Sequence, residues 1–408
     1  MKNEYAENPG DIVKTGKAFV PSLTLSYFST YLLDFLAGLL LLDVSFSFFG
    51  SRDPLHVAIT SQIATISSTA AVIAGIAIAV LSVKVNRKLL LSIGALLIPI
   101  GSIGCILAPN FLALEIFFPF DGIGSIIVGS LAFALAGEAL PLNKRARAIG
   151  WIVSGATWAQ FVGAILIRYF FASGNWRLFL LWYTLPVSTF AFFFSVFGIP
   201  SRSAIFENSE PKTALLSSFK EVFLNKSATA CLVGNLTRHA GLVWGTIFGA
   251  TFLRAFFGLS LANASIALLG GTLCFALGNI FGGHIAHKVG RKLLVVTCLV
   301  SVGFLISAQL FIPDVWVVVA LSFVSSLAGG MGAAGTLNMT VEQVPKNRGT
   351  IMSMSSVFVT LGAAIGAAVG GATLALFGSY RILGLVLVAF DFAAAGIYLF
   401  FTKDPCKT

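Results

Sequence analysis

Charged residues are scarce in this sequence. Asp, Glu, Lys and Arg make up only 10% of the 408 residues, whereas hydrophobic residues make up 57%. A soluble domain carries about 25% charged residues, because it needs a polar surface to face water. The shortage therefore excludes an ordinary soluble protein, and the mean hydropathy of +0.94 predicts an integral membrane protein.

Motifs for enzyme chemistry are also missing. We find no His-Glu-x-x-His, no phosphate-binding P-loop, no dinucleotide fingerprint and no nucleophile elbow. His284 and His287 stand three residues apart but lack a nearby Cys or carboxylate that would complete a metal site. The sequence thus predicts no enzyme, no cofactor and no bound metal. The five cysteines show no paired spacing, which favours packing over disulfides: Cys105, Cys231, Cys274, Cys298 and Cys406.

Twelve apolar segments are long enough to cross a bilayer, which takes about 20 residues in a helix. The alternating pattern of an outer-membrane barrel is absent, so the spanning elements are predicted to be helices. Residues 1–22 have no signal-peptide cleavage site, so the first apolar segment should remain as a span. The predicted spans are 23–48, 57–82, 89–108, 112–136, 149–171, 178–199, 229–253, 262–286, 293–312, 316–340, 350–376 and 382–402.

Lys and Arg are unevenly distributed between these spans. With a cytoplasmic N-terminus, the cytoplasmic segments and tails hold 20 of the 26 basic residues. The outer ends hold four, namely Arg52, Arg177, Arg254 and Arg381. This bias follows the positive-inside rule and predicts a plasma-membrane protein with both termini in the cytoplasm. The net charge of +10 is therefore a topology signal and does not indicate a nucleic-acid partner.

The two halves of the chain repeat at an offset of 204 residues. We therefore predict an all-α membrane protein of two pseudo-symmetric six-helix bundles, a known transporter architecture. The predicted bundles are residues 23–199 and 229–402, joined by a cytoplasmic linker (200–228) and flanked by cytoplasmic tails (1–22 and 403–408). The matching positions are Arg87 to Leu90 with Arg291 to Leu294, Glu138 with Glu342, Pro141 with Pro345, and Arg177 with Arg381.

One loop carries the residues of a known family. Residues Gly283 to Lys292 read Gly-His-Ile-Ala-His-Lys-Val-Gly-Arg-Lys and resemble the Gly-x-x-x-Asp-Arg-x-Gly-Arg-Lys loop of major facilitator superfamily transporters. Glu138 and Glu342 resemble the acids that end spans four and ten in that family. Trp176-Arg177 and Tyr380-Arg381 resemble its aromatic-Arg entry into spans six and twelve. The resemblance covers nearly the whole chain and implies the family's twelve-helix fold.

The resemblance also implies a cytoplasmic gate, and the chain departs from the family there. His287 stands at one of the acidic loop positions and Val83 at the other, so the charge network of the gate must be weaker or built differently. A Gly-Pro motif in span five and an arginine in span four, found in several proton-coupled members, are absent, which leaves substrate and direction open. The expected gate residues are Arg87, Glu138, Gly283, Gly290, Arg291 and Glu342.

Four predicted spans carry small residues at every fourth position, which lets helix backbones approach closely in lipid. In the family's fold, span two faces span eleven and span five faces span eight across the two halves. We therefore expect these faces to meet between the bundles and to let one bundle rock on the other, with ordinary packing as the alternative. The small residues are Ser67, Ala71 and Gly75; Gly155, Ala159 and Gly163; Gly270, Cys274, Gly278 and Gly282; and Gly362, Gly366 and Gly370.

Charged side chains inside the spans need a reason, because each costs about 2.5–3.5 kcal/mol at the bilayer centre. Asp34 lies near the middle of span one, Asp121 in span four, and Arg238 with His239 in span seven. Asp34 and Arg238 are equivalent under the offset of 204 residues, so we expect them to meet near the pseudo-axis. Asp34 is the first candidate for carrying a coupling proton and Asp121 the second. The alternative for Asp34 is a fixed salt bridge to Arg238.

The helices expected to line a central cavity carry aromatic and polar side chains that suit a small organic solute. The leading hypothesis is a secondary active transporter, coupled to protons, that takes up a metabolite or exports a lipophilic compound. The alternatives are an uncoupled facilitator and a receptor of the same fold that binds solute without moving it. We expect a monomer in the lipid bilayer, with a small solute and protons as partners. The expected solute contacts are Tyr27, Tyr31, Phe118, Trp158, Gln160, Asn235, Arg238, His239 and Asn338.

Overall fold

The computed structural model describes residues 17–82, 85–140, 142–200, 219–345 and 348–404 of the chain. These residues form helices joined by turns and short loops, with no strand among them. Eleven helices are long and apolar enough to cross a membrane, and one further span is a bent pair of helical segments. The prediction of an all-α membrane protein with twelve spans is confirmed.

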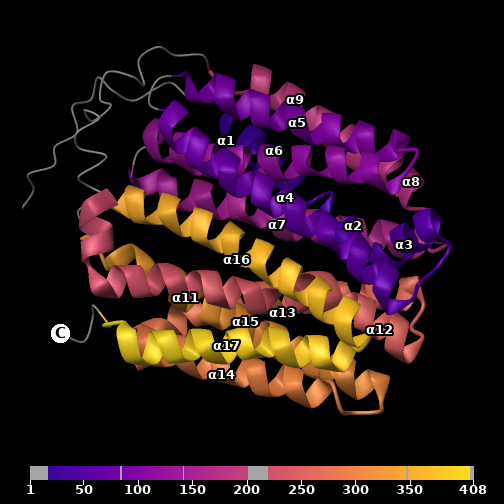
Figure 1. Ribbon diagram of the computed structural model, residues 1–408. Helices are drawn as coiled ribbons and strands as arrows, with labels where there is room; N and C mark the ends of the chain where they lie inside the picture. Colours follow the sequence, from indigo (N-terminus) through magenta and orange to yellow (C-terminus); the bar gives the residue numbers. More distant parts are fainter. Residues whose placement is uncertain (1–16, 83–84, 141, 201–218, 346–347, 405–408) are drawn as a thin grey trace, which may run out of the picture.

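The first six spans form one bundle and the last six form a second bundle beside it (Figure 1). The first bundle contains α1 (Phe19–Ser29), α2 (Asp34–Ala37), α3 (Leu41–Phe49), α4 (Pro54–Leu81), α5 (Arg87–Leu107), α6 (Phe111–Ala139), α7 (Leu142–Phe170), α8 (Trp176–Phe179), the π-helical η1 (Leu180–Thr184) and α9 (Leu185–Phe197). The second contains α11 (Lys226–Val243), the π-helical η3 (Trp244–Phe248), α12 (Gly249–Phe257), α13 (Leu261–Val289), α14 (Arg291–Gln309), α15 (Val315–Glu342), α16 (Arg348–Phe377) and α17 (Tyr380–Phe401).

Equivalent helices of the two bundles begin at equivalent residues. Arg87 and Arg291 open α5 and α14, 204 residues apart. The residues that cap the helix N-termini repeat as well: the side chains of Asn110 and Asp314 accept hydrogen bonds from the first turns of α6 and α15. The repeat seen in the sequence therefore includes residues at which equivalent helices of the two bundles begin.

The bundles meet along two pairs of helices. α4 packs against α16, and α7 packs against α13. These are spans two and eleven, and spans five and eight, so the expected pairing of helices between the halves is confirmed. Figure 1 shows α16 running alongside α4.

The small-residue faces do not lie where we expected them. A side chain at Gly366 of α16 would lie 2.8 Å from the Cα of Ala240 and from Val243, both in α11 of the same bundle. A side chain at Gly155 of α7 would lie 2.8 Å from the carbonyl of Thr24 in α1. The prediction that these faces meet between the bundles is therefore wrong: they bring helices together within each bundle.

Span eight follows the same pattern, whereas spans two and eleven show contacts between the bundles. A side chain at Gly282 of α13 would lie 2.6 Å from the Cα of Met331 in α15, again within one bundle. A side chain at Gly75 of α4 would lie 3.2 Å from Ile126 of its own bundle and 3.6 Å from Val357 of α16. Gly371 of α16, in contrast, faces Ser61 and Gln62 of α4, and a side chain there would lie 2.8 Å from the Ser61 hydroxyl. On span eleven, therefore, a glycine that makes room between the bundles is the neighbour of the periodic Gly370.

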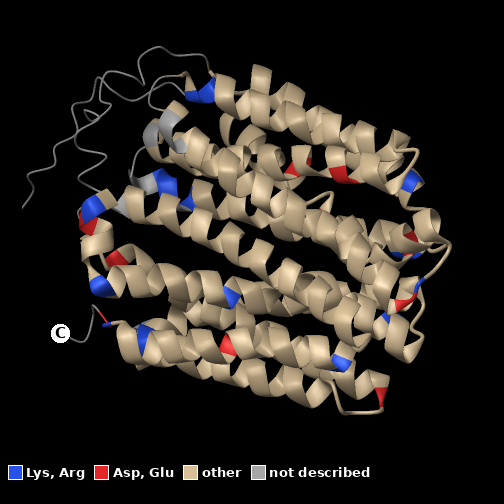
Figure 2. Ribbon diagram, viewed as in Figure 1, with Lys and Arg blue, Asp and Glu red and all other residues tan. Residues whose placement is uncertain are grey.

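The charged residues gather at the two ends of the molecule, with few between them (Figure 2). We call one end the basic end; it holds Lys17, Arg87, Arg145, Lys292 and Lys403, and both described ends of the chain lie there. The opposite end, called the distal end, holds Asp43, Arg52, Arg177 and Arg254.

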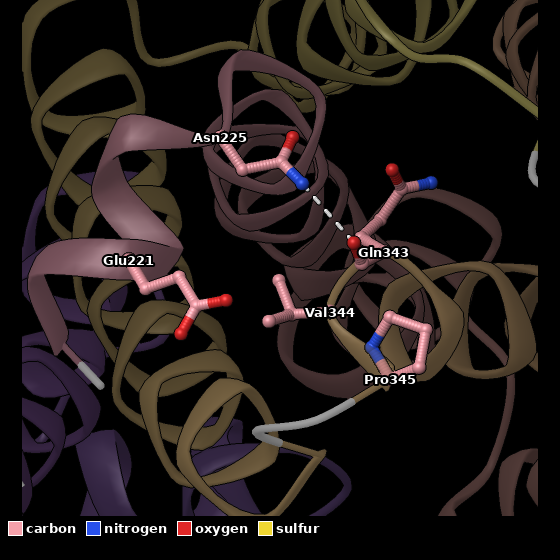
Figure 3. Close-up of a pocket in the computed structure, with 5 residues that line it drawn as sticks. All are labelled: Glu221, Asn225, Gln343, Val344 and Pro345. Atoms are coloured by element: carbon pink, nitrogen blue, oxygen red, sulfur yellow. Dashed lines mark hydrogen bonds between the residues drawn. The ribbon is translucent and has the colours of Figure 1, made fainter. Parts of the chain in front are cut away.

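The described part of the predicted linker packs against the second bundle at the basic end. The Asn225 amide donates to the carbonyl of Gln343 at the end of α15, at 3.1 Å. A cleft of about 280 Å³ lies beside this contact, lined also by Glu221, Val344 and Pro345 (Figure 3). It lies at the end of the bundle and not among the charges inside the spans. Residues 201–218 of the linker lie outside the described part of the chain.

Candidate functional site

The first span is broken in the middle. After α1 ends at Ser29, the backbone N–H of Tyr31 reaches only the carbonyl of Phe28, at 3.3 Å, in place of the regular bond four residues back. The hydroxyls of Ser29 and Thr30 bond to carbonyls in the turn before them, both at 2.7 Å. Such local bonds compete with the helix ladder and favour a bend. The carbonyl of Thr30, which the break leaves without a helix partner, accepts a hydrogen bond from Ser125 of α6, at 3.1 Å. This backbone group therefore has a partner inside the membrane region.

A second irregularity follows four residues after Asp34. Gly38 ends the short α2, and a side chain there would lie 2.5 Å from the carbonyl of Thr246 in η3. Only glycine allows the first span to approach the second bundle this closely. The axis bends by 55° between the segments Phe19–Ala37 and Leu41–Phe49. α2 therefore lies at the contact between the two bundles.

Asp34 points into open space at this contact. Its neighbours Leu33 and Phe35 are buried, whereas Asp34 itself is exposed. Thr246, which faces α2 from the second bundle, is exposed as well. Two exposed polar residues, one from each bundle, thus lie close to the place where Gly38 meets the Thr246 carbonyl. A broken helix in mid-membrane at the contact between two repeats is a common form of transporter site.

A tyrosine and a second carboxylate lie near Asp34, and a second tyrosine packs on the first. Tyr31 and Asp121 both interact electrostatically with Asp34. The Tyr31 hydroxyl lies 3.1 Å from that of Tyr27, and their rings pack edge to face. Asp121 lies behind, only 4% exposed, and its Oδ1 has no hydrogen-bond partner among the described residues. Cys105 of α5 also lies near Asp121.

Arg238 does not join this group. It is 5% exposed, and its guanidinium faces the interior of the second bundle, where it interacts with Asp391 and Tyr398 of α17. One Nη also approaches the carbonyl of Gly329 in α15, at 3.5 Å. The expected meeting of Asp34 and Arg238 is therefore wrong: among the described residues, Asp34 faces carboxyl and phenol groups but no cation.

Removing one charge of the Arg238–Asp391 arrangement should destabilise the second bundle. Asp391 is 3% exposed, so Arg238→Met would leave its carboxylate buried without a compensating charge. We expect the melting temperature in detergent to fall by several degrees, and the added change Asp391→Asn to recover most of the loss. Single variants that melt like the wild type would show that the two charges are not coupled.

The other expected solute contacts divide into two groups. Gln160 lies between the bundles, where it accepts a hydrogen bond from Thr272 of α13 at 3.2 Å. His239 is half-buried on α11 of the second bundle. Asn338 is half-buried on α15, one turn before Glu342. Tyr27, Tyr31, Gln160, His239 and Asn338 therefore remain candidate solute contacts.

Three expected contacts lie elsewhere. The amide of Asn235 is fully used inside the second bundle, where it bonds to Thr340, Ser355 and Tyr398. Phe118 is buried within the first bundle. Trp158 is 53% exposed and stands two residues from Gln160, about 200° around the helix, so it faces away from the second bundle. These positions do not support a role in binding solute.

Comparison with known proteins identifies the family. The model of the Major Facilitator Superfamily matches residues 20–253 and again residues 239–408. The chain belongs to the major facilitator superfamily. It is accordingly a membrane transporter and not an enzyme.

Several relatives match most of the chain at low identity. The uncharacterized MFS-type transporter YfhI of Bacillus subtilis is 26% identical over 80% of this chain and 81% of its own length. The cis,cis-muconate transport protein of Acinetobacter baylyi is 24% identical over 71% of each chain. The crystal structure of a D-xylose-proton symporter superposes with a TM-score of 0.76, at 12% identity, over 96% of this chain and 99% of the other. At this identity the last likeness concerns the fold alone.

The superfamily's loop motif lies within one bundle. Arg291, 7% exposed, forms an ion pair with Glu342 that joins α14 to α15. Both residues belong to the second bundle, so this ion pair does not itself join the two bundles. Their expected place in a cytoplasmic gate stays a prediction. Gly290 has a φ of +95°, which favours glycine, and it lies between α13 and α14. A side chain at Gly283 would have no neighbour within 4 Å. Arg87 opens α5 at the equivalent place, and the side chain of Glu138 lies outside the described part.

Sequence reasoning missed a group of charges at the distal end. Asp43 of α3 accepts hydrogen bonds from Arg254 of the second bundle and from Arg52 of its own. Asp43 is the only charged residue in an apolar run. Since an acid in such a run needs a partner, its position could have indicated an ion pair at this end of the protein.

Proposed function

We propose that this protein is a secondary active transporter that couples the movement of a small organic solute to protons, with Asp34 as the proton carrier. The supporting observation is the position of Asp34: an accessible carboxylate beside a helix break, where the two bundles meet. Rocking of the bundles would expose it to water on one side and then on the other. A carboxylate in that position can take up a proton on one side and release it on the other.

Asp121 is proposed as a second carrier behind the first. It is buried next to Asp34 and has a carboxylate oxygen without a hydrogen-bond partner, so a proton can be held there without breaking an existing bond.

The site supports a neutral or cationic solute. At the depth of Asp34 the described side chains offer a carboxylate, the tyrosines Tyr27 and Tyr31, and the half-buried His239, while Arg238 is turned into its own bundle. An anionic solute would meet Asp34 without a compensating cation. Although one relative is named for the transport of cis,cis-muconate, an anion, this arrangement supports a different solute class for the present chain.

We further propose that the basic end faces the cytoplasm of a cell with this protein in its plasma membrane. The excess of Lys and Arg at that end supports this orientation through the positive-inside rule.

Reconstitution into liposomes tests the proposal. Solutes are first selected by a thermal-shift screen of the purified protein against metabolites and lipophilic cations. In proteoliposomes with an imposed pH gradient, the selected solute should reach a higher concentration on one side, and a protonophore should abolish the difference. An uncoupled facilitator would equilibrate the solute without accumulation, and a receptor would bind it without any flux. The side on which the solute accumulates gives the direction of transport.

A further inference from the structure

The two bundles are joined at the distal end by a buried ion pair. The guanidinium of Arg254 in α12 donates two hydrogen bonds to the carboxylate of Asp43 in α3, at 2.6 and 3.0 Å. Its Nη1 also donates to the carbonyl of Leu39, at 2.8 Å. The side chains of Arg254 and Asp43 are 7% and 5% exposed. The pair therefore closes the distal end at the base of the broken first span.

Other polar contacts between the bundles support this position for the closure. Arg168 of α7 donates to the carbonyl of Ala262 in α13, at 3.0 Å, also in the distal half. The contact of Gln160 with Thr272 lies farther toward the middle. Where both partners are described, the hydrogen bonds that join the bundles thus lie in the middle or the distal half of the protein. The distal end must open by breaking them, and the Arg254–Asp43 pair is the strongest among them because it is bidentate and charged.

Separation of this pair would leave a carboxylate uncompensated, which is strongly unfavourable in a buried place. Arg52 is placed to prevent this. Its Nη2 donates to Asp43 Oδ1, at 3.3 Å, and its guanidinium stacks on the ring of Phe46, at 4.9 Å. Both contacts lie within the first bundle, so they survive when the second bundle moves away. The Arg52 side chain is 53% exposed and thus free to follow the carboxylate.

We propose that Asp43 and Arg254 form the distal gate of the transporter, and that Arg52 takes over Asp43 when the gate opens. In the closed state Asp43 already has two short bonds from Arg254, so Arg52 adds little. In the open state Arg52 is the charged partner that remains. Loss of Arg254 therefore favours the open state, whereas loss of Arg52 favours the closed state. This inference concerns the gate, and it holds whether or not Asp34 carries a proton.

Distance measurements between spin labels test the exchange of partners. The labels are placed at the exposed positions Leu112 of the first bundle and Phe311 of the second, both at the distal end, after replacing the native cysteines. Arg254→Gln should increase the fraction of molecules with the long distance about tenfold or more. Arg52→Gln should reduce that fraction, and Arg52→Gln combined with Arg254→Gln should show less of it than Arg254→Gln alone. Arg381→Gln is the matched control, since this distal arginine stacks on Phe256 of its own bundle and should change nothing.

Solute counterflow gives a second readout that does not depend on Arg254→Gln remaining folded. Arg52 is half exposed, so Arg52→Gln should fold normally and slow counterflow several-fold, because the open state is reached less often. An unchanged distance distribution in Arg254→Gln, a longer distance in Arg52→Gln, or unimpaired counterflow in Arg52→Gln would each overturn the proposal. Absence of proton coupling alongside these gate effects would instead refute only the role of Asp34.

Discussion

Asp34→Asn is expected to abolish pH-driven accumulation of solute while leaving solute counterflow intact. The amide keeps the shape and the hydrogen-bonding capacity of the carboxylate but cannot carry a proton. Accumulation requires net proton movement and should fall to the level of protein-free liposomes. Counterflow exchanges solute for solute without net proton movement, so its rate should stay within about twofold of the wild type.

Glu115→Gln provides the matched control for this variant. Glu115 is another carboxylate of the membrane region, half-buried on α6 two turns before Asp121. The same chemical change there should leave both activities unchanged. Normal accumulation in Asp34→Asn would remove Asp34 from the coupling mechanism. Loss of both activities would show that Asp34 serves solute binding or structure, since it has no salt bridge to Arg238 that could explain the loss.

Gly366→Leu is expected to prevent the second bundle from folding correctly. The new side chain would be forced against the backbone of Ala240 and the side chain of Val243, which cannot move away without separating α16 from α11. Overpacking of a tight contact costs about 1–3 kcal/mol, and contact with backbone atoms belongs at the upper end of that range. Size-exclusion chromatography in detergent should show mostly aggregated protein, with little material at the position of the wild type.

Gly396→Leu tests whether this effect is specific to the site. Gly396 is also a glycine within a helix of the second bundle, but a side chain there would touch nothing within 4 Å. We expect this variant to purify like the wild type. A well-behaved Gly366→Leu that fails only in transport would restore the earlier interpretation, in which the glycine face of span eleven slides on the other bundle.

The fold was predictable because the signals that specify it are local or periodic. Apolar segments of sufficient length predict spans, and the offset of 204 residues predicts two equivalent bundles. The edges were less predictable: α7 begins at Leu142, seven residues before the predicted span, because a hydropathy window ignores polar turns that continue a helix beyond the lipid.

The contacts of individual side chains were not predictable from these signals. Asp34 and Arg238 are equivalent in the repeat, but the chain is broken immediately before Asp34 and is regular through Arg238, so the two side chains point to different surroundings. The spacing of small residues predicts a smooth helix face without showing which neighbour covers it, as Gly366 illustrates. Asp34 and Asp121 were found as charges inside spans, whereas their proximity depends on how α2 and α6 pack.

The most direct test of the account is to measure proton movement driven by the solute itself. Proteoliposomes loaded with a pH-sensitive dye, without an imposed gradient, are given a solute selected by the thermal-shift screen. For the wild type we predict a change of internal pH that begins with solute movement and is removed by a protonophore. For Asp34→Asn we predict solute movement without a pH change. Wild-type protein that moves the solute at full rate with no change of internal pH would contradict proton coupling.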